Sequence, residues 1–111
     1  MITAQLSKLS DIATEAHTRI QQNFSDLDPV VGVSQNMRKS GIPADVMTID
    51  CLKTNKRIIL ILHDQQPELV RYQFAYRDKD PEGQFEEIPF NDLTSDSLYE
   101  WIHRYFSVVL N

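Results

Sequence analysis

The sequence predicts an α+β fold: one or two N-terminal helices, a four-stranded antiparallel meander sheet, and a C-terminal helix packed on one sheet face. Apolar residues recur every three or four positions at both ends of the chain, which is the period of an amphipathic helix. From Ala44 to Phe90 they alternate with polar residues, which is the period of a strand. Short connectors rich in Asn, Asp, Gly and Pro separate these strands, so we expect each strand to turn directly back into the next.

The first helix is predicted over Ala4–Asn23, with an apolar stripe made of Ile2, Leu6, Leu9, Ala13, Ala16 and Ile20. The following segment, 29–40, gives mixed signals. Asp28 followed by Pro29 is typical of a helix start and Gly41 of a helix end, whereas the valines favour extended backbone. We expect a short helix here, and a strand over Val30–Ser34 is the alternative.

The sheet is predicted to contain the four strands Val46–Lys53, Arg57–His63, Leu69–Arg77 and Phe85–Phe90. In the first hairpin we place Cys51 opposite Leu60 and Thr48 opposite His63. This register collects one uniformly apolar face, which we expect to form the core beneath the helices: Met47, Ile49, Cys51, Ile58, Leu60 and Leu62. The aromatic side of the third strand should extend this face with Tyr72, Phe74 and Tyr76.

The last helix is predicted to begin at Thr94, a favourable N-cap residue. Its apolar residues cover more than half of its circumference: Leu98, Tyr99, Trp101, Ile102, Tyr105, Phe106, Val109 and Leu110. One sheet face accepts only about two helices side by side. Part of this apolar surface is therefore expected to lie against another chain, which favours a homodimer.

Length and charge restrict the function classes. With 111 residues and a net charge of −5, the chain is predicted to form a single α+β domain over 1–111 and to be an unfavourable partner for nucleic acid. The longest apolar run, Ile58 to Leu62, is far shorter than the ~20 residues that cross a membrane. The first eight residues lack the pattern of a signal peptide, so we expect a cytoplasmic protein without membrane association.

No catalytic or metal-binding motif stands out in the sequence. The only cysteine, Cys51, and a potential base, His63, are predicted on opposite sheet faces, and the three histidines fall on separate elements. The loop that begins at Asp78 starts like a calcium-binding loop but has Pro89 where a bidentate glutamate is required. We therefore expect no metal site, no cofactor and no enzymatic activity.

Two surfaces are the candidate binding sites. The first is the polar face of the sheet, with Asp50, His63, Arg71, Gln73 and Arg77, where an Asp50–Arg71 contact is expected. The second is the exposed side of the last helix, with Tyr99, His103 and Phe106.

These features favour a small acidic cytosolic protein–protein interaction module, such as an adaptor, a chaperone-like protein or an immunity-like protein. Two alternatives remain open. One is a sheet protein that binds single-stranded nucleic acid by stacking bases on Tyr72, Phe74 and Tyr76. The other is a small enzyme that uses His63 on the outer sheet face.

Overall fold

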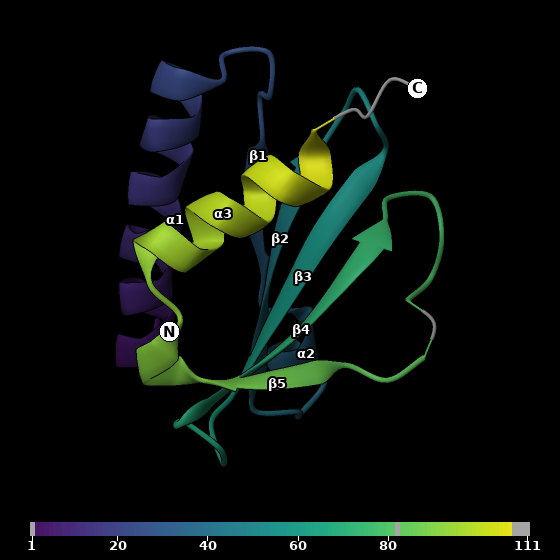
Figure 1. The fold of residues 1–111 in the computed structure, drawn as a ribbon. Helices are drawn as coiled ribbons and strands as arrows, with labels where there is room; N and C mark the ends of the chain where they lie inside the picture. Colours follow the sequence, from purple (N-terminus) through teal and green to yellow (C-terminus); the bar gives the residue numbers. More distant parts are fainter. Residues whose placement is uncertain (1, 82, 108–111) are drawn as a thin grey trace.

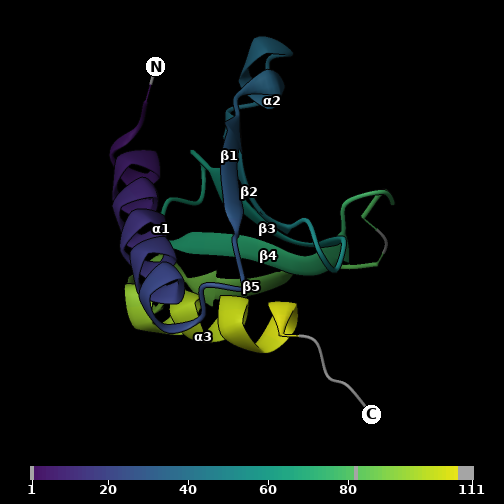
Figure 2. The ribbon, with the colours of Figure 1, turned by 90° about the horizontal axis from the view of Figure 1, so that it is seen from above.

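The computed structural model describes residues 2–81 and 83–107 of the chain. Two layers form the fold, a five-stranded antiparallel sheet and two α-helices that share a core with one of its faces (Figures 1 and 2). The strands lie in sequence order, β1-β2-β3-β4-β5. The predicted α+β class and antiparallel meander are confirmed, and the sheet has one strand more than the four expected.

The N-terminal helix forms where the apolar period predicts it. The helix α1 (Ala4–Asn23) follows Thr3, whose hydroxyl oxygen accepts a hydrogen bond from the backbone N–H of Leu6 at 3.1 Å. Such a cap satisfies an N–H group that has no partner inside the helix. The buried residues of α1 are five members of the predicted stripe: Leu6, Leu9, Ala13, Ala16 and Ile20.

The C-terminal helix also begins at its predicted cap. The helix α3 (Ser95–Phe106) follows Thr94, and Thr94 and Ser97 exchange side-chain to backbone hydrogen bonds in a capping box. A short 3-10 turn, η1 (Phe90–Asp92), connects the sheet to this helix. The predicted apolar residues Val109 and Leu110 lie outside the described residues.

The segment between α1 and the central strands differs from the expected helix. The strand β1 (Val30–Ser34) pairs antiparallel with β2 (Ala44–Cys51), and only one helical turn, α2 (Asn36–Lys39), follows it. The favoured helix over 29–40 is therefore wrong, and the alternative strand is confirmed. Valine and glycine have low helix propensity, and over so short a segment pairing with β2 outweighs the helix-start signal of Asp and Pro.

The other strands lie within a few residues of their predicted bounds: β3 (Lys56–His63), β4 (Leu69–Tyr76) and β5 (Glu86–Pro89). The β2–β3 hairpin is tighter than predicted, because Cys51 pairs with Lys56 instead of Leu60. Asn55, with φ at 61°, supplies the left-handed backbone that this tight turn contains. The pairing is displaced by four positions, an even number, so every side chain keeps its predicted face.

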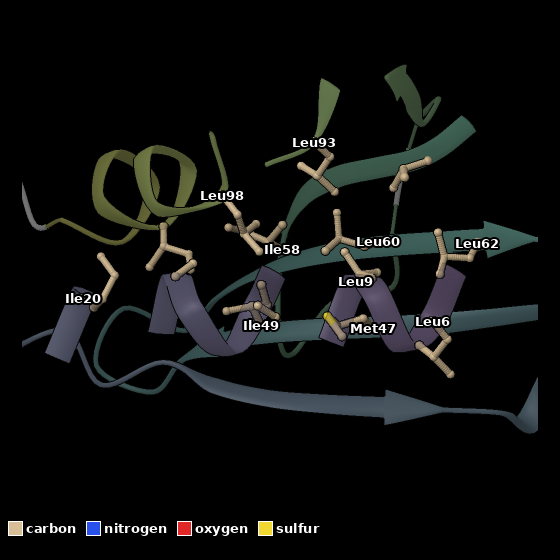
Figure 3. Packing of buried hydrophobic residues seen from close by; sticks show 14 of the residues in the cluster. Leu6, Leu9, Ile20, Met47, Ile49, Ile58, Leu60, Leu62, Leu93 and Leu98 are labelled. Atoms are coloured by element: carbon tan, nitrogen blue, oxygen red, sulfur yellow. The ribbon is translucent and has the colours of Figure 1, made fainter. Parts of the chain in front are cut away.

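The core lies between the helices and the apolar face of the sheet. Figure 3 shows labelled side chains of α1 meeting those of β2 and β3 in this layer. Met47 and Ile49 from β2, and Ile58 and Leu60 from β3, are at most 1% exposed. The small residues Ala13 and Ala16 in the buried stripe of α1 allow the helix to approach the sheet closely.

A buried carboxylate holds the connection between β1 and β2. Asp45 is 1% exposed, and its two carboxylate oxygens accept hydrogen bonds from Nε and Nη2 of Arg38, each at 2.9 Å. Arg38 also donates to both carboxylate oxygens of Asp64, each at 2.7 Å. The hydrogen bonds from Arg38 are the main cause that lowers the pKa of Asp45. This cluster ties α2 to the turn that follows β3.

The Asp45 cluster predicts a loss of stability in acid. Because the folded-state pKa of Asp45 is lowered, its contribution is complete above the unfolded pKa of about 4 and is lost as the pH falls through the folded value. We expect Asp45→Asn to reduce the free energy of unfolding at neutral pH by about 2 kcal/mol and to make stability less dependent on pH below about 4. Urea unfolding measured from about pH 2 to about pH 7, a range that includes the titration of the carboxyl group, checks both statements. An unchanged acid sensitivity in the variant would contradict them.

Candidate functional site

The sheet face opposite the core carries the predicted polar surface. Among the described residues, no long helix packs over this face, and the single turn of α2 lies at its rim (Figure 2). We call it the open face. Strand register places these residues on it: Thr48, Asp50, Arg57, Ile59, Ile61, His63, Arg71, Gln73 and Glu87, with Arg77 directly after β4. All five residues predicted for the outer sheet surface therefore lie on one face, as expected.

The centre of the open face is an ion-pair triad. Asp50 is 8% exposed, and its carboxylate accepts hydrogen bonds from Nε and Nη2 of Arg57 at 2.7 and 2.9 Å. Nε of Arg77 donates to the same carboxylate at 3.4 Å. The hydrogen bonds that Arg57 donates to Asp50 raise the pKa of its guanidinium group.

The expected contact between Asp50 and Arg71 does not form. Asp50 is paired with Arg57 across β2 and β3, whereas Arg71 is paired with Ile61 further along the sheet. Arg71 instead donates from Nε to Glu87 at 3.1 Å and from Nη2 to Gln66 at 3.0 Å. The predicted contact was wrong because it depended on which strand positions lie opposite each other, and alternation alone fixes only the face.

An apolar hollow of about 470 Å³ lies beside Arg71 on the open face. Its lining combines five apolar side chains with four polar ones: Met37, Ile42, Ala44, Ile61, His63, Arg71, Gln84, Phe85 and Glu87. Ile42 is 46% exposed at its rim. At His63 the ring atom Nδ1 accepts a hydrogen bond from the backbone N–H of Gln65 at 3.2 Å. A side chain with an apolar body and an acidic end would find complementary groups here.

The sign of the charge on this surface differs from that of the whole chain. The net charge of the protein is −5, yet the open face carries three arginines against the carboxylates of Asp50 and Glu87. The side chain of Arg71 is 46% exposed and that of Arg77 is 37% exposed. The three arginines and two carboxylates of the open face therefore sum to a net charge of +1, on the side of the sheet that the helices do not cover.

The second predicted surface, on the last helix, is only partly present. Phe106 is 0% exposed and belongs to the core, so its predicted exposure is wrong. The ring of His103 stacks on Phe24 with centroids 3.9 Å apart, and the hydroxyl of Tyr99 accepts a hydrogen bond from Asn23 at 3.1 Å. Both half-buried side chains thus help to hold α3 against the end of α1. Helical spacing did not show which part of the wide apolar surface of α3 would face the sheet.

The aromatic side of β4, which we expected to extend the core, forms a partly exposed cluster with α3 instead. Its members are Tyr72 and Phe74 from β4 and Trp101 and Tyr105 from α3, with neighbouring ring centroids 4.5 to 5.9 Å apart. Phe74 is 42% exposed and Trp101 is half-buried, because β5 pairs with β4 only at Leu69–Tyr72 and ends before Phe74. The sequence held one signal for this exposure: the last predicted strand, Phe85–Phe90, is too short to lie along the whole of the predicted third strand, Leu69–Arg77.

Two chemical sites considered in the sequence, a Cys51–His63 pair and a metal cluster, were checked against the described residues. Cys51 is buried on the core face and His63 lies on the open face, so these two do not form a dyad. No group of three His, Cys, Asp or Glu side chains gathers to hold a metal ion within 2–81 and 83–107. In the same ranges, no helix has both the length and the apolar composition to span a membrane.

Comparisons with protein-family models, with curated proteins and with solved structures gave no match to this chain.

The triad predicts a measurable contribution of Asp50 to stability. We expect Asp50→Asn to lower the free energy of unfolding by about 1–2 kcal/mol, because two guanidinium groups then lose the charge between them. The matched control is Asp96→Asn, which breaks the ion pair with Arg19 at a site where the aspartate side chain is 84% exposed. This control should change stability by about 0.5 kcal/mol or less. Urea unfolding of both variants checks the difference, and equal effects would contradict a special role of the triad.

Proposed function

We propose that this chain is a small acidic cytosolic protein–protein interaction module that acts as a homodimer and without catalysis. The single observation that carries the proposal is the open face, where an apolar hollow of about 470 Å³ adjoins Arg71 and where Arg57 and Arg77 lie on the same face. Interaction sites typically combine an apolar centre with charged groups at the rim, and arginine is enriched in them. Surface complementarity is therefore the mechanism that these residues support best.

The partner of the open face is proposed to be an acidic protein segment that carries a bulky apolar side chain. The hollow lined by Ile42, Ile61 and Phe85 receives the apolar side chain. Arg71 stands at the hollow and Arg77 further along the same face, where their guanidinium groups pair with carboxylates of the partner. Glu87 and Asp50 hold these arginines in place, which limits the side-chain freedom lost on binding.

Selection from a displayed random-peptide library tests this function. We expect the wild-type chain to enrich peptides in which Asp or Glu lies close to an aromatic or aliphatic residue. Arg71→Glu reverses the charge beside the hollow, and Ile42→Ser removes apolar surface from an exposed rim position. Each change should weaken the binding of a selected peptide at least tenfold, which corresponds to about 1.4 kcal/mol.

The matched control for charge reversal is Arg104→Glu, an exposed arginine on α3, next to the aromatic cluster. The peptide affinity of Arg104→Glu should equal that of the wild type. Circular dichroism should show that Arg71→Glu, Ile42→Ser and Arg104→Glu are all folded. Failure to enrich any peptide would overturn the proposed function. The same holds for enriched peptides that bind Arg71→Glu and Ile42→Ser with wild-type affinity.

A second candidate function, binding of single-stranded nucleic acid, is favoured by the aromatic cluster. Phe74 of this cluster and the nearby Tyr76 are 42% and 44% exposed, and one lysine lies beside Tyr76 and another beside Tyr105 of the cluster. Nζ of Lys56 lies 4.9 Å from the ring centroid of Tyr105, and Nζ of Lys79 lies 5.4 Å from that of Tyr76. Exposed aromatic rings with adjacent cations are typical of surfaces on which bases stack. The net charge of −5 opposes this function, so we place it second.

The second function predicts salt-sensitive binding of a fluorescent oligothymidine. Its affinity should fall as the salt concentration rises, and Phe74→Ser should weaken it about tenfold or more, because stacking contributes about 1–3 kcal/mol per base. Ile2→Ser, at another exposed apolar position, is the control and should leave the affinity unchanged. Fluorescence anisotropy that shows no binding at low salt would exclude this function.

A further inference from the structure

The two edges of the sheet are protected unequally. The outer edge strand β5 has the sequence Glu86-Glu87-Ile88-Pro89, and charged residues and proline are common protection against pairing with other strands. The opposite edge strand, β1, has the sequence Val30-Val31-Gly32-Val33-Ser34 and contains neither. Four of its five residues are exposed, and no further strand of the described chain lies beside it. A backbone edge of this kind is a template for another strand.

Gly32, at the centre of β1, has no evident role within the chain itself. A side-chain Cβ at this position would meet only the Oγ1 atom of Thr48, at the ordinary contact distance of 3.4 Å. The position is not among those with positive φ. Glycine inside a strand reduces stability and often marks a place where another backbone approaches closely. The glycine is therefore better explained by a contact outside this chain.

We propose that β1 pairs antiparallel with β1 of a second copy of this chain, so that two sheets join across a two-fold axis at Gly32. This inference rests on the homodimer proposed above and names its interface. Antiparallel pairing of identical strands about such an axis keeps the helices of both copies on one side of the joined sheet. The two open faces then also lie on one side, where they form a continuous surface.

The side chains of β1 match those of a second copy in this register. With Gly32 opposite Gly32, Val31 lies opposite Val33 of the second copy, and the reverse pair also forms. Both valines are on the helix side of the sheet, since they pair with Ile49 and Met47 of β2. They are 38% and 49% exposed, and branched apolar pairs across strands stabilise a sheet.

The charges that flank β1 favour the same antiparallel direction. Exposed Asp26 and Asp28 precede the strand, and exposed Lys39 follows it. Antiparallel pairing brings the acidic end of each copy toward the basic end of the other. Parallel pairing would place like charges together, which is unfavourable.

A five-residue strand edge is a small interface, so the dimer should dissociate on dilution. We expect sedimentation velocity of the wild-type chain to show a mass that rises with concentration from 12.9 kDa toward twice that value. Val31→Lys together with Val33→Lys places like charges opposite each other and should keep the chain monomeric at every concentration. Lysine on an edge strand is a common natural protection against pairing.

A charge-swapped variant tests the register itself. In Val31→Glu with Val33→Lys, the carboxylate at position 31 of each copy faces the ammonium group at position 33 of the other. This variant should dimerise at least ten times more tightly than the double-lysine variant at low salt. Tyr76→Lys, a residue with 44% exposure on β4, is the matched control and should dimerise like the wild type. Thermal unfolding monitors folding in each case.

Three outcomes would overturn the proposal. The first is a wild-type chain that stays monomeric at all concentrations, which would leave the edge of β1 for a strand of another protein. The second is a double-lysine variant that is folded and still dimeric, and the third is a charge-swapped variant no more dimeric than the double-lysine variant.

Peptide binding separates this proposal from the proposed function of the open face. The folded double-lysine variant should still bind a selected peptide, whereas Arg71→Glu should dimerise without binding it.

Discussion

The alternation of side chains along β2 and β3 is the physical constraint on which the rest of the structure depends. Successive residues of a strand point to opposite faces, so the buried pair Met47 and Ile49 leaves Thr48 and Asp50 on the other side. The apolar face requires a cover, which α1 and α3 provide. The polar face is left open for the same reason. A shift of one residue would move the carboxylate of Asp50 into the apolar core, away from its arginine partners, and would move the side chain of Met47 onto the open face.

Two aspartates with little exposure to water, Asp50 and Asp45, are each paired with arginine. The open face balances Arg57 and Arg77 around Asp50, and this satisfies a carboxylate that is largely removed from water. On the other side, the buried Asp45 is satisfied by Arg38, which also reaches Asp64. The cluster around Asp50 leaves guanidinium N–H groups available on the open face, whereas the cluster around Asp45 ties α2 to the turn that follows β3. Similar ion pairs thus serve different purposes, according to what lies around them.

The proposed interfaces of the molecule use different chemistry. The open face offers side chains, namely an apolar hollow and guanidinium groups, whereas the edge of β1 offers its backbone and small apolar side chains. In the proposed dimer, two open faces lie side by side, so a partner with two acidic segments would gain affinity from binding both. The aromatic cluster lies on β4 and α3, two strands away from the β2 neighbour of β1, and is independent of this pairing.

The sequence by itself determined α1, α3, four of the strands and the face of each central side chain, because these follow from local periods of 3.6 and 2. Tertiary structure decided the rest. Pairing with β2 made Val30–Ser34 a strand, and the position of α3 on the sheet buried Phe106 and left Phe74 half-exposed. The local sequence pattern also did not predict that Arg57 would be the partner of Asp50, because the strand register depends on the turn at Asn55. Such outcomes depend on contacts between residues far apart in the sequence, and a local pattern does not contain them.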